Sequence, residues 1–132
     1  MSGDKQLIGN IGLFFTCYEL SRRGWNCLPT TRNAKGVDLV IYSQDAKKSF
    51  TIQIKALSKK TPVPFGNNPQ LIAEFVIVVR NVFAERPEIF IMNSHEVKER
   101  LHRGEKDGKI SYWLQPKDYE DFKDNWDIIG KG

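Results

Sequence analysis

Two short apolar stretches rich in β-branched residues, joined by a polar connection, constrain the fold of this chain most. They occupy residues 37–42 and 50–56, and the intervening sequence SQDAKK is typical of a hairpin loop. Because side chains alternate across a strand, Gln53 and Lys55 should share one face of the second strand. If both strands turn their apolar faces to the same core, Asp38 can lie close to these two side chains.

Apolar periodicity and turn residues predict the other elements. The spacing of apolar residues in 5–23 is that of an amphipathic helix, and Gly24 ends it. A nearly continuous apolar run at 74–79 suits a strand covered on both faces. The remaining predictions are an edge strand at 25–31, a loop at 61–70, a short strand at 89–92, a helix at about 95–102 capped by Asn93 or Ser94, a last strand at 109–114 and a helix at 116–129.

The carboxylate of Asp38 needs a partner, because an ionised group at the start of a half-buried strand requires a counter-charge, hydrogen bonds or a metal ion. Lys55 is a counter-charge within reach. The sequences GVDLV at 36–40 and IQIK at 52–55 together resemble the core of the PD-(D/E)XK nuclease superfamily. These restriction-endonuclease-like enzymes include the Mrr-type endonucleases and the Holliday junction resolvases. The resemblance extends from the first predicted helix to the strand predicted at 74–79.

This resemblance implies an α/β fold with a restriction-endonuclease-like mixed sheet flanked by helices, formed as a single domain by residues 1–132. It also implies a metal-dependent DNA endonuclease that hydrolyses phosphodiester bonds, with Asp38, Gln53 and Lys55 as catalytic residues and Mg²⁺ or Mn²⁺ as cofactor. Asp38 and Gln53 would hold the metal ion, and Lys55 would stabilise developing negative charge. Most relatives carry Glu or Asp at the position of Gln53, and Q-x-K is the form that resembles the Mrr-type enzymes. One fewer negative charge should weaken metal binding.

Glu19 lies in the first predicted helix, and two roles are open for it. A glutamate of the first helix often helps to hold the metal ion in the superfamily, which would add Glu19 to Asp38 and Gln53. That glutamate usually lies nearer the start of the helix than Glu19 does. The alternative is a surface ion pair with Arg22 or Arg23 at helical spacing, which contributes only tenths of a kcal/mol.

Basic residues are concentrated in the half of the chain that carries these motifs. The formal charge is +6 for residues 1–60 and −2 for residues 61–132. A positive surface attracts phosphate backbones largely without regard to base sequence, so DNA is the expected partner. The alternative is a solvated, lysine-rich surface. The residues whose donors suit phosphate oxygens are Arg32, Asn33, Lys35, Lys59 and Lys60.

Several other chemistries find no support in the sequence. It contains no G-x-S-x-G elbow, no P-loop and no H-E-x-x-H motif. Cys17 and Cys27 form no C-x-x-C pair, which argues against a metal-cysteine cluster or a redox centre and suggests free thiols. His95 and His102 are not spaced to bind one metal ion together.

The sequence leaves three functions open. The first is an active nuclease. The second is a DNA-binding or protein-interaction module that has the same fold and no catalytic activity. In the third, Asp38, Gln53 and Lys55 form only a structural hydrogen-bonded cluster.

The sequence also bears on the location and assembly of the protein. The sequence has no run of about 18 apolar residues that could span a membrane, and its start, MSGDKQLIGN, lacks the features of a secretory signal. We therefore expect a cytoplasmic protein without a membrane partner. Because cutting a duplex often needs two active sites, a homodimer is one expected form.

Overall fold

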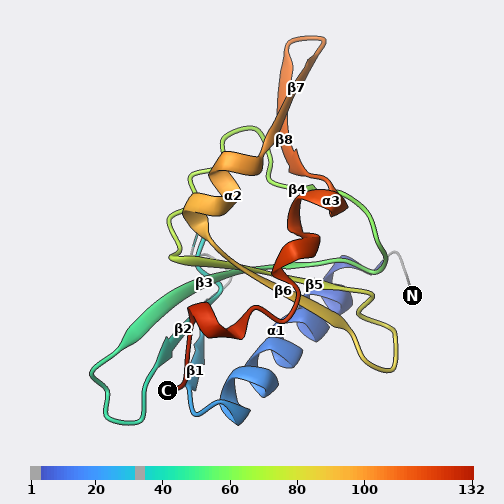
Figure 1. Ribbon diagram of the computed structural model, residues 1–132. Coiled ribbons are helices and arrows are strands. Elements are labelled where there is room, and N and C mark those ends of the chain that lie inside the picture. Colours follow the sequence, from blue (N-terminus) through green and yellow to red (C-terminus); the bar gives the residue numbers. More distant parts are fainter. Residues whose placement is uncertain (1–3, 32–34) are drawn as a thin grey trace.

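A helix and a mixed five-stranded sheet form the larger part of the molecule (Figure 1). The computed structural model describes residues 4–31 and 35–132. The helix, α1, spans Lys5–Arg22, and the side chain of Asp4 caps it by accepting a hydrogen bond from the amide of Leu7 at 3.0 Å. The helix predicted from the apolar spacing is therefore confirmed. No described helix combines the length and the apolar composition that crossing a lipid bilayer requires.

The sheet contains the predicted hairpin near its centre. Its strands lie in the order β1-β2-β3-β5-β6. Strands β1, β2 and β3 are antiparallel, β3 and β5 are parallel, and β5 and β6 are antiparallel. In chain order the five strands span Asn26–Pro29, Leu39–Tyr42, Ser49–Ala56, Phe75–Arg80 and Glu88–Asn93. This is an α/β architecture with a mixed sheet, as expected, and β1 lies at one edge.

Strand β5 is buried along its whole length because both faces of the sheet are covered. On one face α1 packs against side chains that include Ile77. On the other face Val76 and its neighbours are covered by α2 (Ser94–Arg100), α3 (Pro116–Tyr119) and a second, three-stranded sheet. The side chain of Asn93 caps α2 as predicted, and helices flank the mixed sheet on both faces.

The second sheet contains a hairpin that the sequence analysis missed. Its strands, in the order β4-β8-β7, span Val63–Pro64, Lys109–Leu114 and His102–Lys106. Strand β4 lies within the segment predicted as a loop. Helix α2 ends at Arg100 and does not reach His102, because Leu101 is extended (ψ 132°) and the following residues pair with β8. Asp107 and Gly108 have left-handed backbones (φ 54° and 77°), which suit a two-residue turn. The hairpin projects from the body of the molecule (Figure 1).

The C-terminal tail is not the single helix predicted at 116–129. Helix α3 ends at Tyr119, and two short 3₁₀ turns follow, separated by Asp124, whose backbone is left-handed (φ 51°). The turns span Glu120–Phe122 and Trp126–Ile128. A straight helix would keep its apolar side chains on one face, whereas Tyr119 packs on the α2 side of the sheet and Ile129 on the α1 side. The tail crosses the edge at β6, where the amide of Asp124 donates to the carbonyl of Ile89 at 2.9 Å.

Candidate functional site

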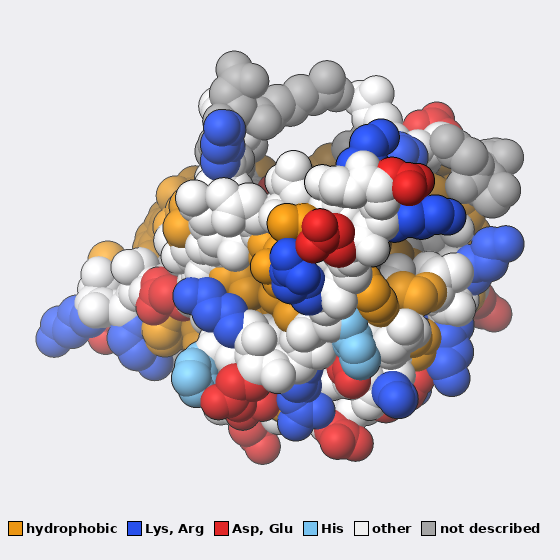
Figure 2. Space-filling model, turned by 90° about the horizontal axis from the view of Figure 1, so that it is seen from above, with side chains coloured by type: hydrophobic (Ala, Val, Ile, Leu, Met, Phe, Trp, Pro, Cys, Tyr) orange, Lys and Arg blue, Asp and Glu red, His pale blue; other side chains and the backbone are white. Residues whose placement is uncertain are grey.

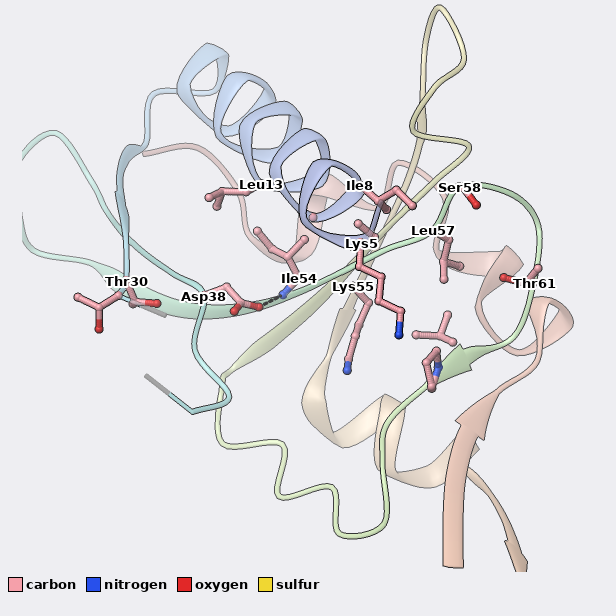
Figure 3. Close-up of a pocket in the computed structure, with 15 residues that line it drawn as sticks. Lys5, Ile8, Leu13, Thr30, Asp38, Ile54, Lys55, Leu57, Ser58 and Thr61 are labelled. Carbon is pink, nitrogen blue, oxygen red and sulfur yellow. Dashed lines mark hydrogen bonds between the residues drawn. The ribbon is translucent and has the colours of Figure 1, made fainter. Parts of the chain in front are cut away.

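The C-terminal end of β3 borders a cleft of about 620 Å³ (Figure 3). The start of α1, the residues that follow β1, and the segment that leads into β4 form its other walls. Helix α1 lies directly on β3 because Gly12 has no side chain, and a Cβ at Gly12 would lie only 2.7 Å from the Cβ of Ala56. This close approach brings the first turns of α1 to the end of β3.

Asp38 is held in the cleft by backbone hydrogen bonds. Its amide donates to the carbonyl of Ile52 at 2.9 Å, which extends the pairing of β2 with β3 by one residue. Its carboxylate oxygen Oδ2 accepts from the amide of Ile54 at 2.7 Å. The other oxygen, Oδ1, makes no hydrogen bond within the described parts of the chain. Within the described residues, Asp38 therefore presents one carboxylate oxygen without a hydrogen-bond partner.

Two lysine side chains enter the same cleft, Lys55 from β3 and Lys5 from the start of α1 (Figure 3). The Nζ of Lys55 lies 4.8 Å from the ring centroid of Phe65. Burial lowers the pKa of the Lys55 ammonium below its usual value, and the charge of Asp38 opposes that change. Sequence analysis missed Lys5, because nothing in the helical pattern distinguishes a lysine in the first turn from a solvated one.

Gln53 does not open into the cleft that contains Asp38 and Lys55. It lines a neighbouring pocket of about 330 Å³, which Phe65 also lines. The register of β2 and β3 nevertheless places Gln53 opposite Asp38 on adjacent strands. The amide oxygen Oε1 of Gln53 is buried and accepts no hydrogen bond from any described residue. The predicted triad is thus divided, with two members in one cleft and the third in the next pocket.

Glu19 does not join the site, because it lines neither of these two pockets. It is 1% exposed, in the second half of α1. Its carboxylate accepts from Arg23 at 2.9 Å and pairs with Arg22 at 3.5 Å and with Arg86 at 3.8 Å. The geometry therefore favours the ion pair over the metal-binding role, and the glutamate is buried where a surface pair was expected.

The residues predicted to bind nucleic acid are dispersed. Lys35 lines the smaller pocket. Lys59 and Lys60 are exposed, and Lys60 forms an ion pair with Glu120 at 3.3 Å. Outside the described residues lie Arg32 and Asn33. On the face that Figure 2 shows, basic and acidic side chains are interspersed.

The oxygen atoms of Asp38 and Gln53 have the chemistry that a hard divalent cation requires. Among the described residues, one is a carboxylate oxygen that lacks a hydrogen bond, and the other is a buried amide oxygen without a partner. In residues 4–31 and 35–132 no three His, Cys, Asp or Glu side chains converge as a metal-binding group. Because these two oxygens belong to different pockets, Asp38 supplies the carboxylate that could hold Mg²⁺ or Mn²⁺ in the cleft, and Gln53 supplies no ligand there. Comparisons of the chain with models of protein families, with curated proteins and with solved structures found no match.

Proposed function

We propose that this chain is a metal-dependent DNA endonuclease of the PD-(D/E)XK type, which hydrolyses phosphodiester bonds in the cytoplasm. The observation that carries the proposal is the meeting of Asp38 and Lys55 in one cleft at the end of β3. The Asp38 carboxylate, one oxygen of which has no hydrogen-bond partner among the described residues, and the partly desolvated ammonium group of Lys55 could there act together on one phosphate, the carboxylate through a metal ion. The order of helix, antiparallel hairpin and parallel strand around them also agrees with the resemblance of the sequence.

Each residue has a role that follows from its surroundings. Asp38 would hold Mg²⁺ or Mn²⁺ in the cleft, and the bound ion would supply a Lewis acid for the attacking water. The ammonium of Lys55 would contact the scissile phosphate and stabilise the negative charge that grows in the transition state. Partial burial strengthens this interaction, because less water screens the charge. Lys5 would bind a neighbouring phosphate of the backbone.

Cleavage by charge-removing variants tests the proposal. Asp38→Asn keeps an oxygen that can accept from the amide of Ile54, and Lys55→Met keeps most of the side-chain volume. Each should lower magnesium-dependent cleavage of plasmid, single-stranded or branched DNA by at least about 100-fold. Asp121→Asn removes an exposed carboxylate outside the cleft and should leave cleavage unchanged. Wild-type rates in Asp38→Asn would refute the assignment.

A second function, DNA binding without catalysis, is favoured because only one carboxylate, that of Asp38, is found among the described residues that line the cleft. It would be the better account if wild type bound DNA in EDTA and gave no magnesium-dependent product. Lys5→Ala and Lys55→Ala should weaken such binding and reduce its salt dependence.

If Asp38→Asn lowered only the free energy of unfolding, the cluster of Asp38, Gln53 and Lys55 would be purely structural. Sedimentation with and without DNA tests whether a homodimer supplies the second site that duplex cutting needs.

A further inference from the structure

Helix α1 and the edge strand β1 bring the two cysteines together. Cys27 Sγ lies 3.8 Å from the carbonyl oxygen of Cys17 and 3.9 Å from Ser21 Oγ. Both cysteines are half-buried, so each is packed but remains within reach of small molecules in solution. Ten residues separate them in the chain, and only the packing of α1 beside β1 makes them neighbours.

The two thiols differ in acidity. The hydrogen bond from Cys17 lowers the pKa of Cys27 to about 7, burial opposes this change, and the bond from Ser21 adds to it. The same contact raises the pKa of Cys17, because its proton is held by the neighbouring sulfur. At neutral pH about half of Cys27 is thus a nucleophilic thiolate, whereas Cys17 stays a protonated thiol.

We propose that Cys17 and Cys27 form a reactive dithiol, which hydroperoxides oxidise to a disulfide that links α1 to β1. The thiolate of Cys27 attacks the terminal oxygen of the hydroperoxide, which forms an S–O bond and breaks the O–O bond. The alkoxide or hydroxide ion released takes a proton from solvent and leaves as an alcohol, or as water from hydrogen peroxide. The thiol of Cys17 then attacks the sulfenic sulfur of Cys27. The S–S bond forms as the S–O bond breaks, and water leaves with the proton of Cys17. The peroxide accepts two electrons, one from each sulfur.

The position of the pair gives the disulfide a structural consequence. Helix α1 supplies Lys5 to the cleft from its first turn, and Thr30, which follows β1, lines the same cleft. A covalent link between Cys17 and Cys27 would fasten these two elements to each other. The modification itself does not depend on nuclease activity, and it is tested without any DNA.

Hydrogen peroxide and intact-mass measurement test the dithiol in the full-length chain. Wild type should lose the mass of two hydrogen atoms and yield a dithiothreitol-sensitive cross-linked peptide that contains both cysteines. Cys17→Ser should form no internal disulfide, and its Cys27 sulfenic acid should be trapped by dimedone. Cys27→Ser should react with peroxide much more slowly. Dithiothreitol, exposed to the same peroxide, serves as a reference dithiol. If wild type kept two free thiols under conditions that oxidise dithiothreitol, the proposal would be overturned.

The rate of alkylation shows whether Cys27 is more reactive than an ordinary cysteine thiol. At pH 7, iodoacetamide should modify Cys27 at least about fivefold faster in the folded chain than in the urea-unfolded chain. In the unfolded chain the pKa of a cysteine thiol is about 8.5, so less of it is ionised at this pH. Ser21→Ala removes one hydrogen bond to this sulfur and should move the midpoint of the rate to higher pH. Equal rates in the folded and unfolded chains would also overturn the proposal.

Discussion

Arg80 carries a buried charge at the end of β5 and joins three parts of the chain. Its Nε and Nη2 each donate to Glu88 of β6 at 3.0 Å, and its Nη1 donates to Glu120 of the tail at 2.8 Å. It is 4% exposed, and its guanidinium lies 4.7 Å from the ring centroid of Phe90. Two-pronged pairing with a carboxylate compensates for the loss of hydration, so the charge is tolerated inside the molecule.

The pairing of Glu88 with Arg80 should make stability depend on acid pH. The Arg80 guanidinium holds the pKa of Glu88 at about 2, below its ordinary value of 4.5. The unfolded chain therefore binds a proton at higher pH than the folded chain, so stability should fall as pH decreases from about 5 to about 2. Glu88→Gln should lower the free energy of unfolding at pH 7 by about 1–2 kcal/mol, because partial exposure screens the pair.

Urea unfolding at several pH values measures this effect. The slope of stability against pH should be shallower in Glu88→Gln than in wild type below pH 5. Glu85→Gln is the matched control, since Glu85 is exposed and lies outside the Arg80 cluster. It should keep the slope of wild type. Identical slopes in Glu88→Gln and wild type would contradict the assignment of the shift to Arg80.

At the scale of elements, the crossing of α1 over β3 sets the shape of the cleft. Gly12 is buried against Ala56, whereas Gly9, one turn earlier, is exposed and has open space where its Cβ would lie. Glycine is a poor helix former, so each glycine inside α1 lowers the stability of the helix. At Gly12 the close packing of α1 on β3 offsets this loss, and at Gly9 nothing does. The two glycines therefore have opposite structural roles in the same helix.

Alanine at each glycine should shift stability in opposite directions. Gly9→Ala should raise the free energy of unfolding by about 0.5–1 kcal/mol, because it improves helix propensity without a steric cost. Gly12→Ala should lower it by about 1–3 kcal/mol, since the new methyl group would force α1 away from Ala56. Chemical denaturation of the two variants measures both changes. Equal stabilisation by both substitutions would show that α1 can shift on β3 without penalty.

At the scale of the whole molecule, the C-terminal tail ties together the two faces of the sheet. Beyond the edge of β6 it returns to the α1 side, where the indole N–H of Trp25 donates to the carbonyl of Gly130 at 3.0 Å. The guanidinium of Arg23 lies 4.0 Å from the ring centroid of Trp126. Ile129 is 5% exposed and belongs to the core beneath α1. Ile129 thus anchors the tail in the core.

Two neighbouring isoleucines in the tail test this role. Ile129→Ala should lower the free energy of unfolding by about 3 kcal/mol, because it removes a buried side chain and leaves a cavity. Ile128→Ala is the matched control, since Ile128 is 39% exposed, and it should change stability by less than about 1 kcal/mol. Urea denaturation measures both. Similar small losses in the two variants would mean that the tail is only loosely attached to the core.

Local patterns were sufficient for the features that depend on near neighbours in the chain. The spacing of apolar residues predicted α1, and the continuous run at 74–79 predicted a doubly covered β5. Of the two caps predicted for α2, Asn93 and Ser94, the structure shows Asn93. The hairpin and its alternation also brought Asp38 near Lys55. These features follow from sequence because a helix and a strand each repeat with a fixed period, and a cap acts within one turn.

The tertiary structure decided which distant groups meet. Only the folded chain brings Arg86 to Glu19, Cys27 to Cys17 and Lys5 into the cleft of Lys55. The apolar spacing at 116–129 suited one helix, but that tail instead covers both faces of a sheet and must bend around its edge. The alternation that groups Gln53 with Lys55 does not say which pocket each side chain enters. Such contacts depend on how elements cross and which faces they cover, and a local period carries no information about either.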